Sequence, residues 1–119
     1  MNLRLASLTA IAAAFAGPAV AHHSFAMFDA AKTVTVQGTV TEFAWVNPHS
    51  WLRVMVNEGK TGKPVLWTLE LSSPSLLNTM GLQANSLKPG DVVSVTFHPM
   101  KDGSRGGQAL RVGVTSGHP

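Results

Sequence analysis

Hydrophobic and polar residues alternate along much of the chain after residue 32, and a two-residue period is typical of strands that bury one face. In the stretch "TVTVQGTVT", Val34, Val36 and Val40 alternate with threonines. Gly38 falls on the same apolar face, where a missing side chain allows a sharp bend or the close approach of another backbone. The alternation loses phase near Phe43-Ala44-Trp45, which predicts a long, curved first strand with a bulge or coil near its end.

The same criterion predicts four further strands. "SWLRVMV" places Leu52, Val54 and Val56 on one face, and the glycines and proline of "NEGKTGKP" predict a hairpin loop before the strand "VLWTLEL". The Pro-Gly turn of "LKPGD" then leads to the strand "VVSVTF", and the alternation returns in "LRVGV" near the end of the chain.

One short helix is predicted between the third and fourth strands. Ser73 is a suitable N-cap, Pro74 fits the first helical position, and Gly81 fits the position just after the helix end. The segment also carries an apolar stripe: Leu76, Leu77 and Met80.

The order of three strands, a helix and two strands predicts an all-β protein with one short helix, arranged as a five-stranded OB-fold-like barrel (β-β-β-α-β-β). Another small β-barrel or sandwich with one capping helix is the alternative. We expect the barrel to span residues 32–116 and a short tail to cover residues 117–119. In OB-type barrels, the loop between the first two strands and the loop between the last two commonly bind ligands.

The first 21 residues have the pattern of a secretory signal peptide. Arg4 supplies a positive charge, Leu5 to Phe15 form an apolar run too short to span a bilayer, and Ala19-Val20-Ala21 is a small-residue cleavage site. We therefore predict a signal peptide at residues 1–21 and a periplasmic or secreted protein that does not span the membrane after cleavage. The mature chain would begin at His22 with an N-terminal histidine arm, residues 22–31.

Composition narrows the partners and the chemistry. Without Arg4, 8 of the 9 Lys and Arg residues remain against 6 Asp and Glu residues, so the mature net charge is 8 − 6 = +2. Lys and Arg do not cluster in the sequence, so we do not expect nucleic acid as a partner. The chain contains no cysteine, which excludes disulfides, thiolate nucleophiles and cysteine-ligated zinc or iron–sulfur sites.

The stretch "AHHSF" makes His22 a candidate metal ligand. As the terminal residue it could chelate one copper ion through its α-amino group and its own Nδ1, since both groups lose their protons near neutral pH. A second imidazole would complete a three-nitrogen histidine brace suited to Cu(II). His23 is a weaker partner for the same ion, because adjacent side chains of an extended segment point apart. The simpler interpretation is that His-His is only the polar start of the chain.

The predicted barrel brings other candidate ligands to the two ligand-binding loops. His49 lies in the first-to-second loop, and His98 opens the fourth-to-fifth loop, so both could converge with a folded-back arm. Met27 or Met100 could add a thioether, which would favour Cu(I). Alternatively, His49 only bonds turn carbonyls, and His98 is only an exposed strand end.

Three phrases carry a family resemblance: "HHSFAMFD", "WVNPHSW" and "SLKPGDVVSVTFHPMKDGS". With these phrases the chain resembles a domain-of-unknown-function family, family 6152, of small exported bacterial proteins. The resemblance covers nearly all of the mature chain and implies a single exported domain. It implies no chemistry, because the family has no established activity.

The aromatic residues Phe43, Trp45 and Trp51 bracket the His49 loop and allow a function of another class. Aromatic rings on an OB surface can grip sugars or peptide side chains, although core packing is the commoner role of a large aromatic residue. Trp67, inside an apolar strand, is assigned to the core. The carboxylates form no local pair, and neither Ser24 nor Ser50 has a nucleophile-elbow context, so the pattern favours binding over catalysis.

The leading hypothesis is therefore a periplasmic, single-domain protein that binds a metal ion, with copper preferred, for carriage or sequestration. The predicted ligands are His22 and His49, with His98 optional and His23 subordinate, and another periplasmic protein could serve as partner. The alternative is a non-metal binding or accessory module that uses the aromatic surface for a peptide or glycan. A third hypothesis is an envelope protein without catalytic role.

Overall fold

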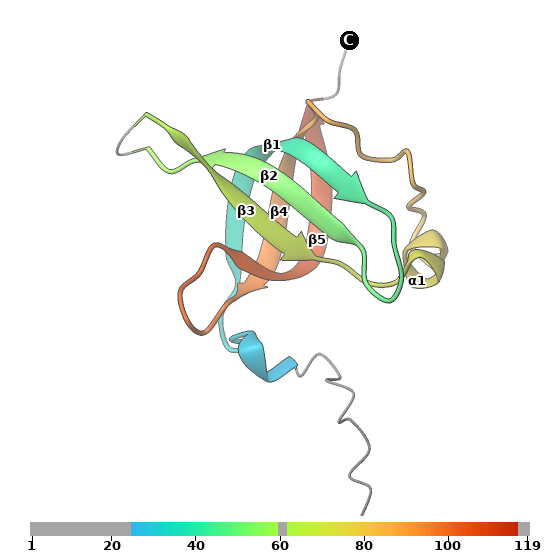
Figure 1. Cartoon of the computed structure of the whole chain (residues 1–119), viewed down its shortest axis with the longest axis horizontal. Helices are drawn as coiled ribbons and strands as arrows, with labels where there is room; N and C mark the ends of the chain where they lie inside the picture. The colour runs from blue at the N-terminus through green and yellow to red at the C-terminus, as the bar shows by residue number, and fades with distance from the viewer. Residues whose placement is uncertain (1–24, 60–61, 117–119) are drawn as a thin grey trace, which may run out of the picture.

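The structure is a computed structural model that describes residues 25–59 and 62–116 (Figure 1). The predicted signal peptide, His22, His23 and the tail at residues 117–119 lie outside the described residues. The elements in chain order are η1 (Phe25–Met27), β1 (Val34–Ala44), β2 (Trp51–Asn57), β3 (Pro64–Glu70), α1 (Pro74–Thr79), β4 (Val92–Pro99) and β5 (Gly106–Ser116).

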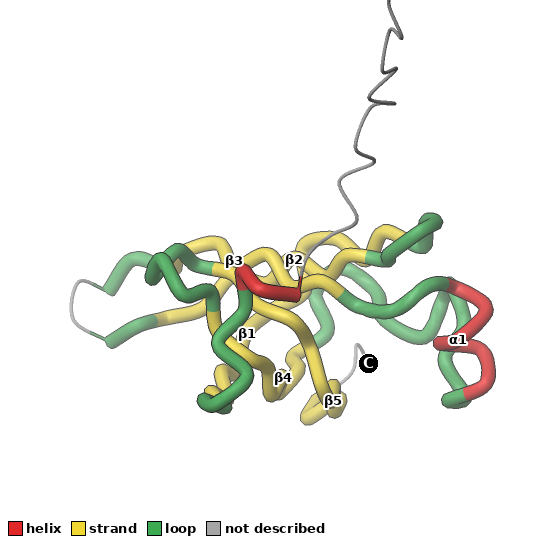
Figure 2. Tube along the Cα trace, turned by 90° about the horizontal axis from the view of Figure 1, so that it is seen from below, coloured by secondary structure: helices red, strands yellow, loops and turns green. Residues whose placement is uncertain are grey.

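The five strands close into a barrel in the order β1-β2-β3-β5-β4, with α1 between β3 and β4 in sequence. All neighbouring pairs are antiparallel except β3 and β5, which pair in parallel over Thr68–Glu70 and Gly106–Gln108. This short parallel pair closes the barrel. The predicted OB-type order of strands and helix is confirmed, and Figure 2 shows α1 at one end of the barrel, away from η1.

Strand β1 pairs with two strands at Gly38. Gly38 lies opposite Val56 of β2 and Val93 of β4. A Cβ atom at this position would lie 2.7 Å from the carbonyl oxygen of Met55, so only glycine fits the approach of the β2 backbone. The predicted close approach is confirmed. The register shift lies between Val40 and Glu42, slightly earlier than the sequence pattern indicated.

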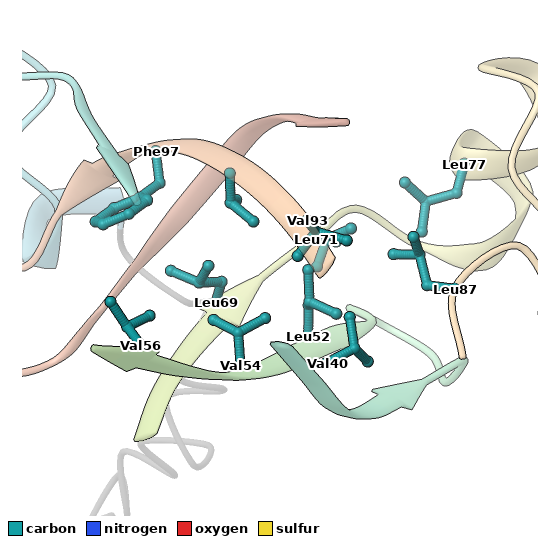
Figure 3. Close-up of a cluster of buried hydrophobic side chains, with 11 residues drawn as sticks. Val40, Leu52, Val54, Val56, Leu69, Leu71, Leu77, Leu87, Val93 and Phe97 are labelled. Carbon is teal, nitrogen blue, oxygen red and sulfur yellow. The ribbon is translucent and has the colours of Figure 1, made fainter. Parts of the chain in front are cut away.

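The core fills the barrel interior and extends to one open end. Figure 3 shows Phe97 and Val56 at one end of the cluster and Leu77 of α1 with Leu87 at the other. The predicted inward face of β2 is confirmed, because its three alternate aliphatic side chains are all buried: Leu52, Val54 and Val56.

Two apolar patterns of the sequence do not match burial. The cap residues of α1 behave as predicted, since the Ser73 hydroxyl accepts a bond from Leu76 N and Gly81 has φ of 87°. Only Leu77 of the helical stripe is buried, however, while Leu76 and Met80 are exposed. In β5, Leu110 and Val114 are exposed and Val112 packs against the core. Register shifts in the β4–β5 ladder interrupt the alternation there.

Candidate functional site around His49 and Glu70

The loop that carries His49 is held in place by backbone bonds on both sides of Ser50. Ser50 N donates to Ser72 O at 3.0 Å, and Leu71 N donates to Ser50 O at 2.8 Å. These bonds extend the β2–β3 pairing past the end of β3, and Ser50 itself is fully buried. The peptide bond between Asn47 and Pro48 is cis. These contacts of Ser50 therefore hold His49 next to the last residues of β3.

His49 meets a buried carboxylate. Its Nδ1 lies 2.5 Å from Oε1 of Glu70, the last residue of β3. The Glu70 side chain is 5% exposed and the His49 side chain 27% exposed. A carboxylate at that depth needs a polar or charged partner, and the imidazole supplies one. Because Nδ1 is itself buried, the exposed part of the His49 side chain belongs to the rest of the ring.

A surface pocket of about 350 Å³ opens over this pair. Its walls come from the His49 loop, the end of β3, the start of α1 and β5, and include Pro48, His49, Glu70, Ser73, Leu76 and Gln108. The site therefore lies at the first-to-second loop, where the sequence predicted a ligand site.

A second pocket of about 230 Å³ also includes Glu70 in its lining. Trp51 of β2, Gly106 of β5 and two methionines, Met27 and Met100, contribute to this lining. Because Glu70 lines both pockets, the two are neighbours.

The N-terminal arm is docked against the loop between β4 and β5. Lys101 N donates to Met27 O at 3.0 Å, and Asp29 N donates to Pro99 O at 2.8 Å. Phe28 forms an isolated bridge with Met100 and is only 4% exposed. In Figure 1 the short η1 helix lies beside this loop. The start of the described chain is thus fixed next to the second pocket.

The sequence placed His98 at the opening of the loop after β4, but it is the penultimate residue of β4 itself and pairs with Gln108 of β5. Its Nδ1 lies 2.7 Å from the carbonyl oxygen of Lys32, the residue that follows the arm. Because a carbonyl oxygen only accepts, this contact places the ring proton on Nδ1. Among residues 25–59 and 62–116, no three His, Asp or Glu side chains gather in a group that could hold a metal ion. His98 therefore does not join His49 and Glu70 in such a group, and its role as an optional third ligand stays a prediction.

The three aromatic residues near the site divide between core and pocket. The Phe43 and Trp45 rings meet edge to face, with centroids 5.7 Å apart and planes at 77°, and both pack against the core. Trp51 lines the second pocket. Trp67 packs against Phe97, as predicted for a core residue, while its indole N–H reaches Glu58 at the surface.

Two arginines near the strands are paired with carboxylates. Arg53 contacts Glu42, and Arg105 donates from Nε and Nη2 to the two Glu58 oxygens at 3.0 and 3.2 Å. The Arg105 guanidinium holds the pKa of Glu58 below its usual value of 4.5, with help from the Trp67 indole, and the pKa of Arg105 is raised in turn. Both arginine charges are thus balanced locally.

A model of a family of unknown function, DUF6152, matches residues 10–109. The chain belongs to this family. A comparison with curated proteins finds no match.

Solved structures similar to the DUF6152 chain support its fold. A crystal structure of the mitochondrial single-stranded DNA binding protein Rim1 from S. cerevisiae aligns with a TM-score of 0.56 at 9% identity, covering 73% of this chain and 96% of that one. The selenomethionine-labelled crystal aligns with a TM-score of 0.57 at 8% identity, covering 74% and 97%. A small single-stranded DNA-binding protein from Streptomyces coelicolor has a TM-score of 0.44 at 20% identity, over 70% and 91%. The two Rim1 alignments, at 9% and 8% identity, establish the OB fold alone.

Glu70 is the site residue of the DUF6152 chain that the sequence pattern did not single out. It is the last residue of β3 and lies in the apolar stretch "VLWTLEL", where a lone carboxylate between Leu69 and Leu71 is unusual. The hairpin register pairs Trp51 with Glu70, which brings His49 to the same end of the sheet. That register, counted back from the β2–β3 loop, is the signal that could have revealed the pair.

Within the described part of the chain, no helix is long and apolar enough to cross a membrane.

Proposed function

We propose that this DUF6152 protein is an exported, periplasmic protein that binds a copper ion through His49 and the mature N-terminal His22, for carriage or sequestration. The observation that carries the proposal is the contact between His49 Nδ1 and Glu70 Oε1. A histidine that binds a metal through one ring nitrogen usually contacts a carboxylate or carbonyl through the other. Glu70 would therefore orient the imidazole and leave Nε2 as the ligand atom.

The docked arm supports a contribution from His22. The described arm reaches Met27, which lines the pocket that shares Glu70 with the His49 pocket. His22 lies three positions before Phe25, the first residue of η1, and an extended segment of that length spans up to about 10 Å. The proposal requires this segment to fold back towards His49. The α-amino group, its imidazole and the His49 imidazole would then supply three nitrogens, a set that suits Cu(II).

The first test is electron paramagnetic resonance of Cu(II) bound to protein that begins at His22. We expect a tetragonal three-nitrogen signal at one equivalent of copper. The signal should be lost in a version whose His22 α-amino group is acetylated, because the blocked amine can no longer coordinate the ion. Weak signals without a fixed stoichiometry in both samples would overturn the proposal.

His49→Ala should lower the Cu(II) affinity, because it removes one of the three proposed nitrogen ligands. Glu70→Gln should lower the affinity by about 10–100-fold, because it removes the group that orients the ligand. His118→Ala is the matched control for the loss of one imidazole, and we expect the affinity to stay unchanged. Isothermal titration against a competing chelator measures all three. Equal affinities for His49→Ala and His118→Ala would exclude His49 as a ligand.

The second candidate function is a non-metal binding or accessory module for a peptide or glycan. Trp51 favours it, because this large aromatic side chain lines a surface pocket. Phe43 and Trp45 contribute less, since their rings are not coplanar and pack against the core.

We also expect the protein not to bind single-stranded DNA, although proteins named for that activity share its fold. Glu70 lines both pockets, and Arg53 and Arg105 are paired with carboxylates. Fluorescence anisotropy with a labelled oligothymidylate should detect no binding tighter than the roughly 10⁻⁴ M limit of non-specific association. Tighter binding that weakens steadily with added salt would contradict this expectation.

A further inference from the structure

We propose a second metal site, for the soft monovalent ion Cu(I), formed by the thioether sulfurs of Met27 and Met100 in the pocket beside Trp51. It goes beyond the proposed function, because it uses sulfur ligands from other elements and leaves His49 out. It involves binding only, so it needs no redox partner.

The two methionines come from segments that are far apart in sequence and are held together by backbone contacts. Met27 ends η1, and its carbonyl oxygen accepts a bond from Lys101 N at 3.0 Å. Met100 pairs with Phe28 in an isolated bridge. Because each thioether is adjacent to one of these contacts, ordering the arm brings both side chains to one pocket before an ion arrives. Such preorganisation lowers the entropic cost of binding.

The Met100 thioether packs over a glycine, and both methionine side chains are partly open to solvent. A Cβ atom on Gly106 would lie 3.5 Å from Cγ and 4.0 Å from Sδ of Met100, so the thioether lies directly over a glycine. Gly107 lines the same pocket. Met27 is 37% exposed, and Met100 is partly exposed, although methionine in a small domain is usually buried. Both side chains are therefore accessible to a small ion.

The chemistry of the lining suits Cu(I) better than a hard cation. Thioether sulfur is a soft ligand that selects Cu(I). The Trp51 ring lines the same pocket and can stabilise a cation through its π face. The positive charge of Arg105 in the pocket wall is balanced by Glu58.

The test is competition for Cu(I) between the chain beginning at His22 and the chelator bathocuproine disulfonate, under anaerobic conditions with ascorbate. The variant Met27→Leu/Met100→Leu should weaken Cu(I) binding by about tenfold or more, comparable to the loss caused by disturbing a metal ligand. Leucine keeps the size and apolar character of methionine, so the fold should be kept. Met80→Leu is the matched control, because Met80 is exposed at the C-cap of α1, and the affinity of this variant should equal that of the unaltered protein.

A second readout identifies the ligands directly. With Ag(I) as a redox-inert stand-in for Cu(I), the methyl resonances of Met27 and Met100 should shift in NMR spectra of methyl-labelled protein, while those of Met55 and Met80 should not. Shifts confined to other methionines, or equal Cu(I) affinities of the double variant and Met80→Leu, would overturn the proposal.

The Cu(I) proposal and the Cu(II) proposal can be tested independently, because different variants should affect each site. His49→Ala should leave the Cu(I) affinity unchanged, and the double methionine variant should leave the Cu(II) signal unchanged. A loss of Cu(I) binding in His49→Ala would mean that a single mixed site replaces the thioether site, which would overturn this inference.

Discussion

Replacing Phe97 by alanine is expected to lower the free energy of unfolding by about 3–5 kcal/mol, the range for large aromatic truncations in a packed core. Phe97 is fully buried at one end of the core (Figure 3). Its ring lies 5.4 Å from the Trp67 ring, centroid to centroid. The substitution removes this apolar contact and leaves a cavity that β-barrel backbones cannot close freely. A small domain has only about 5–15 kcal/mol of stability, so the loss would be a large share of the total.

Urea unfolding followed by tryptophan fluorescence measures the effect of Phe97→Ala, because Trp67 reports on the altered contact. The comparison is Leu66→Ala on β3, since Leu66 is 46% exposed and its truncation should cost less than about 1 kcal/mol. Similar losses for the two variants would show that the packing around Phe97 does not stabilise the barrel.

Gly107→Ala should lower the free energy of unfolding by about 1–3 kcal/mol, because it inserts a methyl group where no space exists. A Cβ atom at Gly107 would collide with Cδ2 of the Phe97 ring and lie 2.5 Å from the carbonyl oxygen of His98. Neither group moves easily, since one belongs to a packed ring and the other to the β4 backbone. Gly107 also pairs with Leu69 where β3 and β5 close the barrel. The strain would therefore affect the pairing of β3 with β5.

Gly113→Ala is the matched control for Gly107→Ala. Gly113 lies in the same strand, and a Cβ atom there would meet no heavy atom within 4 Å. Its stability should be unchanged or slightly raised, because alanine restricts the unfolded chain. Thermal unfolding of the two variants side by side measures the difference. A loss in Gly113→Ala as large as that in Gly107→Ala would mean that strand propensity, and not the collision, controls the outcome.

The position of the arm connects the fold to both proposed sites. Its backbone bonds to Pro99 and Lys101 extend the edge of the barrel at the loop between β4 and β5. The arm thereby occupies part of the face that OB-type barrels commonly use for ligands. A ligand of this protein would therefore meet arm side chains such as Met27 as well as strand side chains.

The sequence by itself determined the features that depend on neighbouring residues. The period of two in β2 is local, and so is the Ser73 cap with its Pro74 and Gly81, because each needs only a few residues along the chain. The need for glycine at position 38 was also readable, since an absent side chain within an apolar face points to close backbone approach. His49 was placed in the correct loop for the same reason: the order of elements defines the loops.

Only the tertiary structure decided which residues meet. The contact of His49 with Glu70 depends on the register between β2 and β3, and the burial in β5 depends on register shifts against β4. The parallel pairing of β3 with β5 joins segments that the sequence separates by a helix and a strand. Met27 and Met100 share a pocket because the arm pairs with a distant loop. Contacts of this kind depend on how the whole barrel closes, and a local hydrophobic pattern does not determine that closure.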